Sequence, residues 1–287
     1  MKRILDLFFV VSLFLLLTIR VDAGTFLNQD EVQISAGTKH SHEADVHGSF
    51  GQIEVTRSKF NLEEKFKAGE VPLSFYVSSE NMDLNENITL ELPTHLVATT
   101  VGLGVKLPMP FLDQEHYFLG VDVLPSMYRE DWAWKSGSFR IPFRVYGIYK
   151  QSESLIAVAG AYVRPEFEDR VLPIVGVIWK PNDRLSFNLA SDDPNITYKL
   201  NDQWTLLTEF GYANGEYEVT RGGQNGTVLQ YRETSTGVGF KYAFTKNWEA
   251  KVSAGGVFGR QLKYRDGAGK LAAAGSIYTD VKLEGKF

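Results

Sequence analysis

The C-terminal stretch 279–287 alternates residue by residue between two chemical classes. Its small or apolar members alternate with charged ones, in the order Thr279, Asp280, Val281, Lys282, Leu283, Glu284, Gly285, Lys286, Phe287. Successive side chains of a β-strand point to opposite faces of the sheet. The stretch therefore predicts a strand with one apolar face and one fully charged face, a pattern that suits a membrane barrel or one sheet of a soluble β-sandwich.

The alternation recurs along the chain and favours a barrel. It is seen at 204–212, 237–244 and 250–258, where inward positions mix Gly with charged residues, as a wet or polar-packed lumen would. Several of these segments are longer than the five or six residues usual in soluble sheets, and their length suits a tilted membrane crossing. The last strand ends on Phe287, which resembles the C-terminal signal that outer-membrane barrels present to their assembly machinery. We expect Phe287 to serve as that assembly signal.

The connections between these segments alternate between short and long. Short ones fall at 150–153, 181–183, 201–203 and 245–247, and longer polar ones at 128–138, 164–170, 221–227 and 263–270. Membrane barrels show this rhythm, with short periplasmic turns and longer outer loops. Trp179, Trp204 and Trp248 all border short turns, which predicts an aromatic girdle at one membrane interface.

Extending the rhythm gives a strand count. The candidate strands are 29–38, 49–60, 70–79, 95–107, 115–127, 139–149, 154–163, 171–180, 184–190, 196–200, 204–220, 228–244, 248–262 and 271–287. This predicts an all-β, antiparallel transmembrane β-barrel of about 14 strands, an even number as in bacterial barrels. The segments 184–190 and 196–200 are short for a crossing of about 9–11 residues, so a barrel of 12 strands is the alternative.

The N-terminus has the layout of a secretory signal peptide. Lys2 and Arg3 precede an apolar run from Leu7 to Leu17, and Ala23 offers a cleavage site before Gly24. We expect residues 1–23 to be removed, because the apolar run is too short for a membrane anchor of about 20 residues, and residues 24–287 to form one barrel domain. The expected location is the outer membrane of a bacterial cell, and the expected partners are outer-membrane lipid and the barrel assembly machinery.

Composition excludes several kinds of chemistry. Cys is absent, which excludes disulfides, thiolate metal sites and thiol catalysis. The formal net charge is −5 without a basic cluster, which argues against nucleic acid as a partner. No cofactor motif is present, because the Gly-X-Gly sequences lie within predicted strands and no helix follows them. We therefore expect no cofactor and no enzymatic activity.

The region from Phe139 to Tyr231 resembles a known family. It contains the runs FRIPFRVYGIY (139–149) and LPIVGVIWKPNDR (172–184), followed by PNITY (194–198) and a Gly211-Tyr212 pair. These runs are similar to the uncharacterised bacterial family DUF6268, which is assigned to the porin-like outer-membrane barrels. The resemblance implies the fold and the location, and it supplies no catalytic residues.

The His residues are the weak candidates for a metal site. His40, His42 and His47 fall in a predicted outer loop with Glu43 and Asp45, and imidazoles two residues apart can reach one cation. Their spacing matches no established metal signature, so we expect a solvated polar loop without a bound metal. His95 and His116 are isolated and are expected to be ordinary residues at strand ends.

Three functions remain open at this point. The first is a passive or weakly selective pore for small solutes, whose lumen-facing residues would be Arg144, Lys150, Glu209, Lys251, Asp280, Lys282 and Glu284. The second is a structural or adhesive barrel with a packed, non-conducting lumen. The third is an outer-membrane enzyme, for which only the His-rich loop gives any support. The near balance of charge signs in the first set favours a pore without strong ion preference.

Overall fold

The computed structural model describes residues 27–287 except 49, 70, 88–91, 110, 133–135, 222–223 and 268. The expected signal peptide, residues 1–23, lies outside the described residues. No helix in the described part of the chain is long and apolar enough to cross a membrane. The elements are β1 (Leu27–Asp45), β2 (Gln52–Ala68), β3 (Val71–Glu86), β4 (His95–Pro108), β5 (Tyr117–Val123), β6 (Ser126–Arg129), η1 (Ser136–Ser138), β7 (Phe139–Arg140), β8 (Phe143–Ser152), β9 (Leu155–Val163), β10 (Val171–Trp179), β11 (Leu185–Asn188), β12 (Asn195–Lys199), β13 (Trp204–Arg221), β14 (Gln224–Ala243), β15 (Trp248–Tyr264), β16 (Lys270–Ala272) and β17 (Ser276–Lys286).

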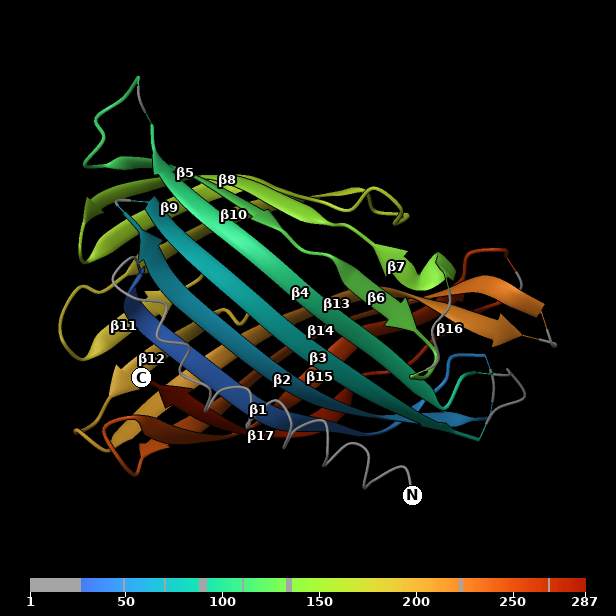
Figure 1. Cartoon of the computed structure of the whole chain (residues 1–287). Coiled ribbons are helices and arrows are strands. Elements are labelled where there is room, and N and C mark those ends of the chain that lie inside the picture. The colour runs from blue at the N-terminus through green and yellow to red at the C-terminus, as the bar shows by residue number, and fades with distance from the viewer. Residues whose placement is uncertain are drawn as a thin grey trace.

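These elements form one closed antiparallel barrel of fourteen wall strands (Figure 1). Three wall strands are interrupted, so that β5 continues as β6, β7 as β8 and β16 as β17. Pro125 and Pro142 stand at two of these interruptions, because proline cannot donate a ladder hydrogen bond. Neighbouring wall strands pair in chain order, and β1 closes the barrel on β17 with Gly37 opposite Lys282.

The strand count predicted from the sequence is confirmed. The twelve-strand alternative is wrong, because β11 and β12 pair with each other and with β10 and β13 on either side. They contribute to the wall although they are only 4 and 5 residues long.

The outward face of the wall is an apolar belt. Large apolar side chains stand exposed on β4, β5, β8, β10, β13, β14, β15 and β17, among them Val101, Leu103, Leu119, Val145, Val175, Leu206, Phe210, Val238, Phe240, Val252, Ile277, Val281 and Leu283. Trp179, Trp204 and Trp248 lie at the rim that also holds Phe287, and the Trp248 ring packs against the Phe287 ring at 5.5 Å between centroids. We call this end of the barrel the terminal rim and the opposite end the far rim.

The two sides of the barrel differ in height. Strands β13 and β14 are 18 and 20 residues long, whereas β8 to β12 are much shorter and end nearer the terminal rim. In Figure 1 the long strands extend well past the short ones, on the side away from the C-terminus. Above the short strands, β13 pairs in parallel with β6 through Glu218 and Arg129. The ring of strands is therefore smaller at the far rim than at mid-height.

Apolar side chains fill this smaller ring. They come from the inward faces of the long strands and from the turn after β1, and we call them the far-rim cluster: Ala44, Val46, Ile53, Val55, Met82, Leu84, Leu96, Tyr217, Val219, Leu229, Tyr231, Leu262, Tyr264, Leu271 and Ala273. All are buried, and several are wholly inaccessible to solvent. The far half of the barrel therefore has a packed interior of the kind found in small barrels, whose lumen side chains fill the space.

Several strands are longer than the sequence predicted. The predicted segments 29–38, 49–60 and 70–79 correspond to β1, β2 and β3, which continue to Asp45, Ala68 and Glu86. The predicted loop 221–227 is largely strand, since β13 runs to Arg221 and β14 begins at Gln224. The prediction relied on alternation between apolar and polar residues, and this alternation disappears where the outward side chains are polar too.

Candidate functional site

The terminal half of the barrel encloses a charged cavity of about 200 Å³. Its lining comes from β1, β2, β3, β13, β14, β15 and β17, mostly from their inward faces, and from Asp192, Asp193 and Asn195 between and at the start of the short strands β11 and β12. The charged lining residues are Lys39, Arg57, Lys59, Glu80, Asp192, Asp193, Glu209, Glu233, Lys241, Lys251, Asp280, Lys282 and Glu284. Six of them are cationic and seven anionic, so the cavity is close to neutral overall.

One ion-pair group is centred on Lys251. Its Nζ lies 2.7 Å from Glu209 Oε2 and 2.5 Å from Asp280 Oδ2. The hydroxyls of Ser253 and Tyr278 donate to Glu209 at 2.6 and 2.8 Å. The three charges thus come from β13, β15 and β17, which the barrel brings together across its interior.

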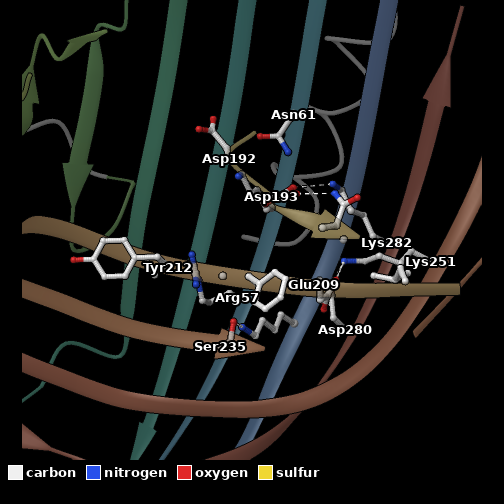
Figure 2. Close-up of a pocket in the computed structure, with 18 of the residues that line it drawn as sticks. Arg57, Asn61, Asp192, Asp193, Glu209, Tyr212, Ser235, Lys251, Asp280 and Lys282 are labelled. Atoms are coloured by element: carbon white, nitrogen blue, oxygen red, sulfur yellow. Dashed lines mark hydrogen bonds and ion pairs between the residues drawn. The ribbon is translucent and has the colours of Figure 1, made fainter. Parts of the chain in front are cut away.

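A second group lies nearer the terminal rim. Lys241 Nζ lies 2.7 Å from Glu249 and 2.8 Å from Glu284, and Lys282 Nζ lies 2.6 Å from Glu284. Lys282 also reaches Asp193 at 3.1 Å. Figure 2 shows this last contact, in which Asp193 approaches Lys282 from the connection between β11 and β12.

The connection 189–194 therefore belongs to the cavity. Asp192 pairs with Arg144 at 2.9 Å, while Asp193 pairs with Lys282. The enclosing wall alone would raise the pKa of Asp193, but the charges of Lys59 and Lys282 outweigh it and hold that pKa below its ordinary value. The two aspartate side chains are nevertheless 68% and 64% exposed, so the space that they face is open to water.

A third group separates the cavity from the far-rim cluster. The Glu233 carboxylate is surrounded by Lys39 at 3.5 Å, Arg57 at 3.4 Å and Arg260 at 3.2 Å. A bulge in β15 allows the last contact, because Gly259 takes a φ of 60° and the backbone there turns Arg260 inward. This conformation is readily available only to glycine. Glu80 lies 2.7 Å from Arg57 and supplies a second carboxylate, so two carboxylates offset the charges of the three cations.

The structure distributes the predicted lumen-facing residues over three places. Glu209, Lys251, Asp280, Lys282 and Glu284 line the cavity. Arg144 pairs with Asp192 beside the cavity lining, and Lys150 pairs with Glu153 at the turn between β8 and β9 on the terminal rim.

Sequence analysis missed the groups around Glu233. Lys39, Arg57 and Glu80 fall in or next to predicted strands, but their strands carry polar residues on both faces and the inward set was not assigned. The alternation of inward and outward positions could have identified them. Residues 57, 59 and 61 of β2 face inward and alternate with outward-facing residues, as residues 280, 282 and 284 do along β17.

The structure corrects the prediction of a His-rich outer loop. His40 and His42 lie within β1, and only His47 lies in the turn that follows. His40 Nδ1 is 3.0 Å from the Thr56 hydroxyl, and the His40 and His42 rings meet edge to face at 4.8 Å. In the part of the chain that the structure describes, no group of three or more His, Cys, Asp or Glu side chains could hold a metal ion.

We expect these imidazoles to be dispensable. Exchanging His40, His42 and His47 together for Ala should leave the melting temperature unchanged, with or without added zinc. A ligand that binds only the native state must stabilise it. A zinc-dependent rise in melting temperature that disappears in the triple variant would contradict this expectation.

The longer polar connection 164–170 is a fixed part of the structure. Arg164 is buried, and its guanidinium donates to the Asn214 carbonyl at 2.9 Å and to the Asp169 carbonyl at 3.0 Å. The Phe167 ring lies between the guanidinium groups of Arg140 and Arg164, each 4.5 Å from its centroid. Phe167 is only 3% exposed, which explains how a charged loop can be anchored.

Comparison with solved structures finds other β-barrels. The COG4313 outer membrane channel from Pseudomonas putida F1 is 10% identical, with a TM-score of 0.49 over 93% of this chain and 100% of that one. The KdgM porin is 12% identical, with a TM-score of 0.37 over 88% and 99% of the two chains. The translocator domain of the autotransporter NalP from Neisseria meningitidis is 12% identical, with a TM-score of 0.36 over 93% and 90%.

Comparison of the sequence with curated proteins and with family models identifies a similar family. No match is found among curated proteins. The family described as Domain of unknown function (DUF6268) matches residues 144–275, which extend from β8 to the segment just before β17. This match confirms the resemblance inferred from the runs at 139–149 and 172–184. Residues 144–275, a little under half of the chain, are thus similar to the DUF6268 family.

Proposed function

We propose that this protein is an outer-membrane β-barrel that lets small polar or charged solutes pass with weak selectivity between cations and anions. The observation that carries the proposal is the charged cavity, whose aspartates at 192 and 193 are about two-thirds exposed to water inside the wall. A pore that discriminates strongly between ions concentrates one sign of charge, whereas this lining is nearly balanced.

The outward face supports the membrane location. The apolar belt over these strands is costly in water and suits a hydrocarbon environment, where a closed barrel pairs its backbone groups between strands. Three Trp residues at the terminal rim suit a membrane interface. Outer-membrane lipid is therefore the proposed partner of the belt, and the assembly machinery the proposed partner of Phe287.

The far-rim cluster favours a second candidate, a structural barrel that does not conduct. Its side chains are buried together across the smaller ring, and an apolar cluster at that level argues against a polar passage along the barrel axis. The two candidates differ in one observable, which is whether the terminal cavity connects to both sides of the membrane.

Single-channel recording of the refolded protein in planar bilayers tests the proposal. We expect conductance in the wild type, and we expect Glu209→Gln to shift the reversal potential across a salt gradient towards the value for anions. The shift follows because Lys251 would lose one of its two carboxylate partners.

The matched control is Asp113→Asn, which removes a carboxylate from the turn between β4 and β5, outside the cavity lining. It should leave the reversal potential where it was. A correctly folded wild-type barrel that never conducts would reject the pore and leave the structural barrel.

A further inference from the structure

The connection between β4 and β5 presents exposed apolar side chains at the terminal rim. Phe111 is 95% exposed and Leu112 is 50% exposed, and both lie in the turn rather than on a wall strand. A single exposed apolar side chain is ordinary in proteins, whereas a contiguous apolar surface marks a site of interaction. These two side chains belong neither to the far-rim cluster nor to the lining of the charged cavity. What they contact must therefore lie outside the barrel.

Backbone hydrogen bonds fix the shape of this turn. The Leu112 amide donates to the Met109 carbonyl at 3.2 Å, which closes the first half of the turn. The Lys150 amide of β8 donates to the His116 carbonyl at 2.8 Å, which ties the second half to a wall strand. The exposure of Phe111 is therefore part of a defined turn geometry.

The turn leans outward from the wall instead of continuing along the barrel axis. In Figure 1 the described part of the connection between β4 and β5 stands out sideways from the terminal rim. The Met109 methyl group lies 3.6 Å from the position that a Cβ atom would take on Gly147. Gly147 faces outward, because it pairs with Leu119, whose exposed side chain belongs to the apolar belt. The start of the turn therefore rests on the outer face of the wall.

The apolar surface of the turn continues the apolar belt. Leu103 and Leu107 on the outer face of β4 are 62% and 40% exposed, and Leu107 lies just before the turn. Beside them the Tyr117 and Tyr149 rings, from the ends of β5 and β8 at the terminal rim, pack 4.9 Å apart between centroids. Aromatic side chains at this level are typical of a membrane interface. The belt and the turn thus form one apolar surface, and what covers the belt reaches Phe111 as well.

The second half of the turn is polar. Asp113, Gln114, Glu115 and His116 follow Leu112 directly. The Asp113 carboxylate accepts from the Glu115 amide at 3.1 Å, and its other oxygen lies 2.9 Å from His116 Nδ1. The Asp113 and His116 side chains are 59% and 40% exposed. An apolar half followed by a solvated polar half suits a segment at the boundary between lipid and water.

We infer that Phe111 and Leu112 form a lipid anchor, which inserts into the membrane leaflet at the terminal rim. The partner is the boundary between lipid headgroups and acyl chains, because the anchor continues the belt that hydrocarbon covers. The anchor fixes the depth of the barrel on the side of β4 and β5. The inference rests on the proposed membrane location of the belt and is independent of whether the barrel conducts.

Single spin labels test the anchor, because the chain has no Cys of its own. Leu112→Cys, Gln114→Cys and Leu103→Cys are each labelled with a nitroxide and refolded into phosphatidylcholine vesicles. Collisions of the label with oxygen, which concentrates in hydrocarbon, are compared with collisions with a water-soluble nickel chelate. The oxygen-to-nickel ratio at position 112 should be severalfold higher than at 114 and should approach the ratio at 103 on the belt.

A second substitution in the labelled Leu112→Cys protein tests the part played by Phe111. Phe111→Asn should lower the oxygen-to-nickel ratio at position 112, because the turn then loses its larger apolar side chain. The matched control is Glu115→Gln in the same protein, on the polar half of the same turn. It should leave the ratio unchanged.

The outcomes separate the anchor from the membrane location. Equal ratios at 112 and 114, with the label at 103 in lipid, would overturn the anchor and keep the barrel in the membrane. A label at 103 that collides mainly with the nickel chelate would overturn the membrane location and the anchor with it. A label at 112 that neither reagent reaches would show a protein contact there and would also overturn the anchor. A high ratio at 112 that falls with Phe111→Asn supports it.

Discussion

Leu229→Ala is expected to lower the free energy of unfolding by about 2–5 kcal/mol, the range for Leu truncated in a packed protein core. Leu229 is 0% exposed and belongs to the far-rim cluster, where its neighbours come from several strands and cannot collapse readily into the space left behind. The measurement is urea unfolding of the barrel in lipid vesicles.

Leu206→Ala is the matched control for this loss. Leu206→Ala removes the same side-chain atoms from β13, but the Leu206 side chain faces outward and is 36% exposed. Lipid can fill the space vacated there, so the loss should be clearly smaller. Equal losses at the two positions would show that the far-rim cluster is not packed as a core.

A charge placed on the apolar belt should have a comparable effect if the belt faces lipid. Val281 is 57% exposed near the middle of β17, where it pairs with Val252 of β15. Val281→Arg is expected to cost about 2–4 kcal/mol, as for Arg or Lys on a lipid-facing site near the bilayer midplane. Unfolding in vesicles and the yield of assembled protein in the outer membrane both report it.

Depth in the membrane gives the control. Phe244 is 47% exposed and follows the end of β14 at the terminal rim, where the cost of Arg falls to about 0–1 kcal/mol. Phe244→Arg should therefore assemble almost normally. A barrel whose belt faces water would tolerate both substitutions alike, and that outcome would reject the membrane location.

Much of this architecture could be predicted from alternation alone. The strands at the C-terminal end have apolar outward faces and polar inward faces, so the ranges 248–262 and 271–287 are close to β15 and to β16 with β17. The same alternation placed Asp280, Lys282 and Glu284 on one face, and the structure sets all three along the cavity. Where one face of a strand is apolar and the other is polar, the two-residue alternation in the sequence is enough to assign each side chain to its face.

Other features depend on contacts between distant segments and leave no local signal. The far-rim cluster mixes residues from β1 to β4 with residues from β13 to β16, and each contributes only one or two apolar residues at a strand end. The anchoring of the loop 164–170 depends on Arg140 and Asn214, which lie far from it in sequence. A run of charges such as Glu166 to Arg170 appears solvated until the partners that neutralise it are known.

The parallel contact between β6 and β13 has a consequence for the order in which the barrel folds. Most of the ladders join strands that follow one another along the chain, and such local pairings form early because little chain entropy is lost in closing them. Pairing of β1 with β17 and of β6 with β13 instead requires segments that are distant in sequence to meet. The far-rim cluster contains residues from both ends of the chain, so it is shielded from water only after these last pairings have formed. Its packing then stabilises the completed barrel.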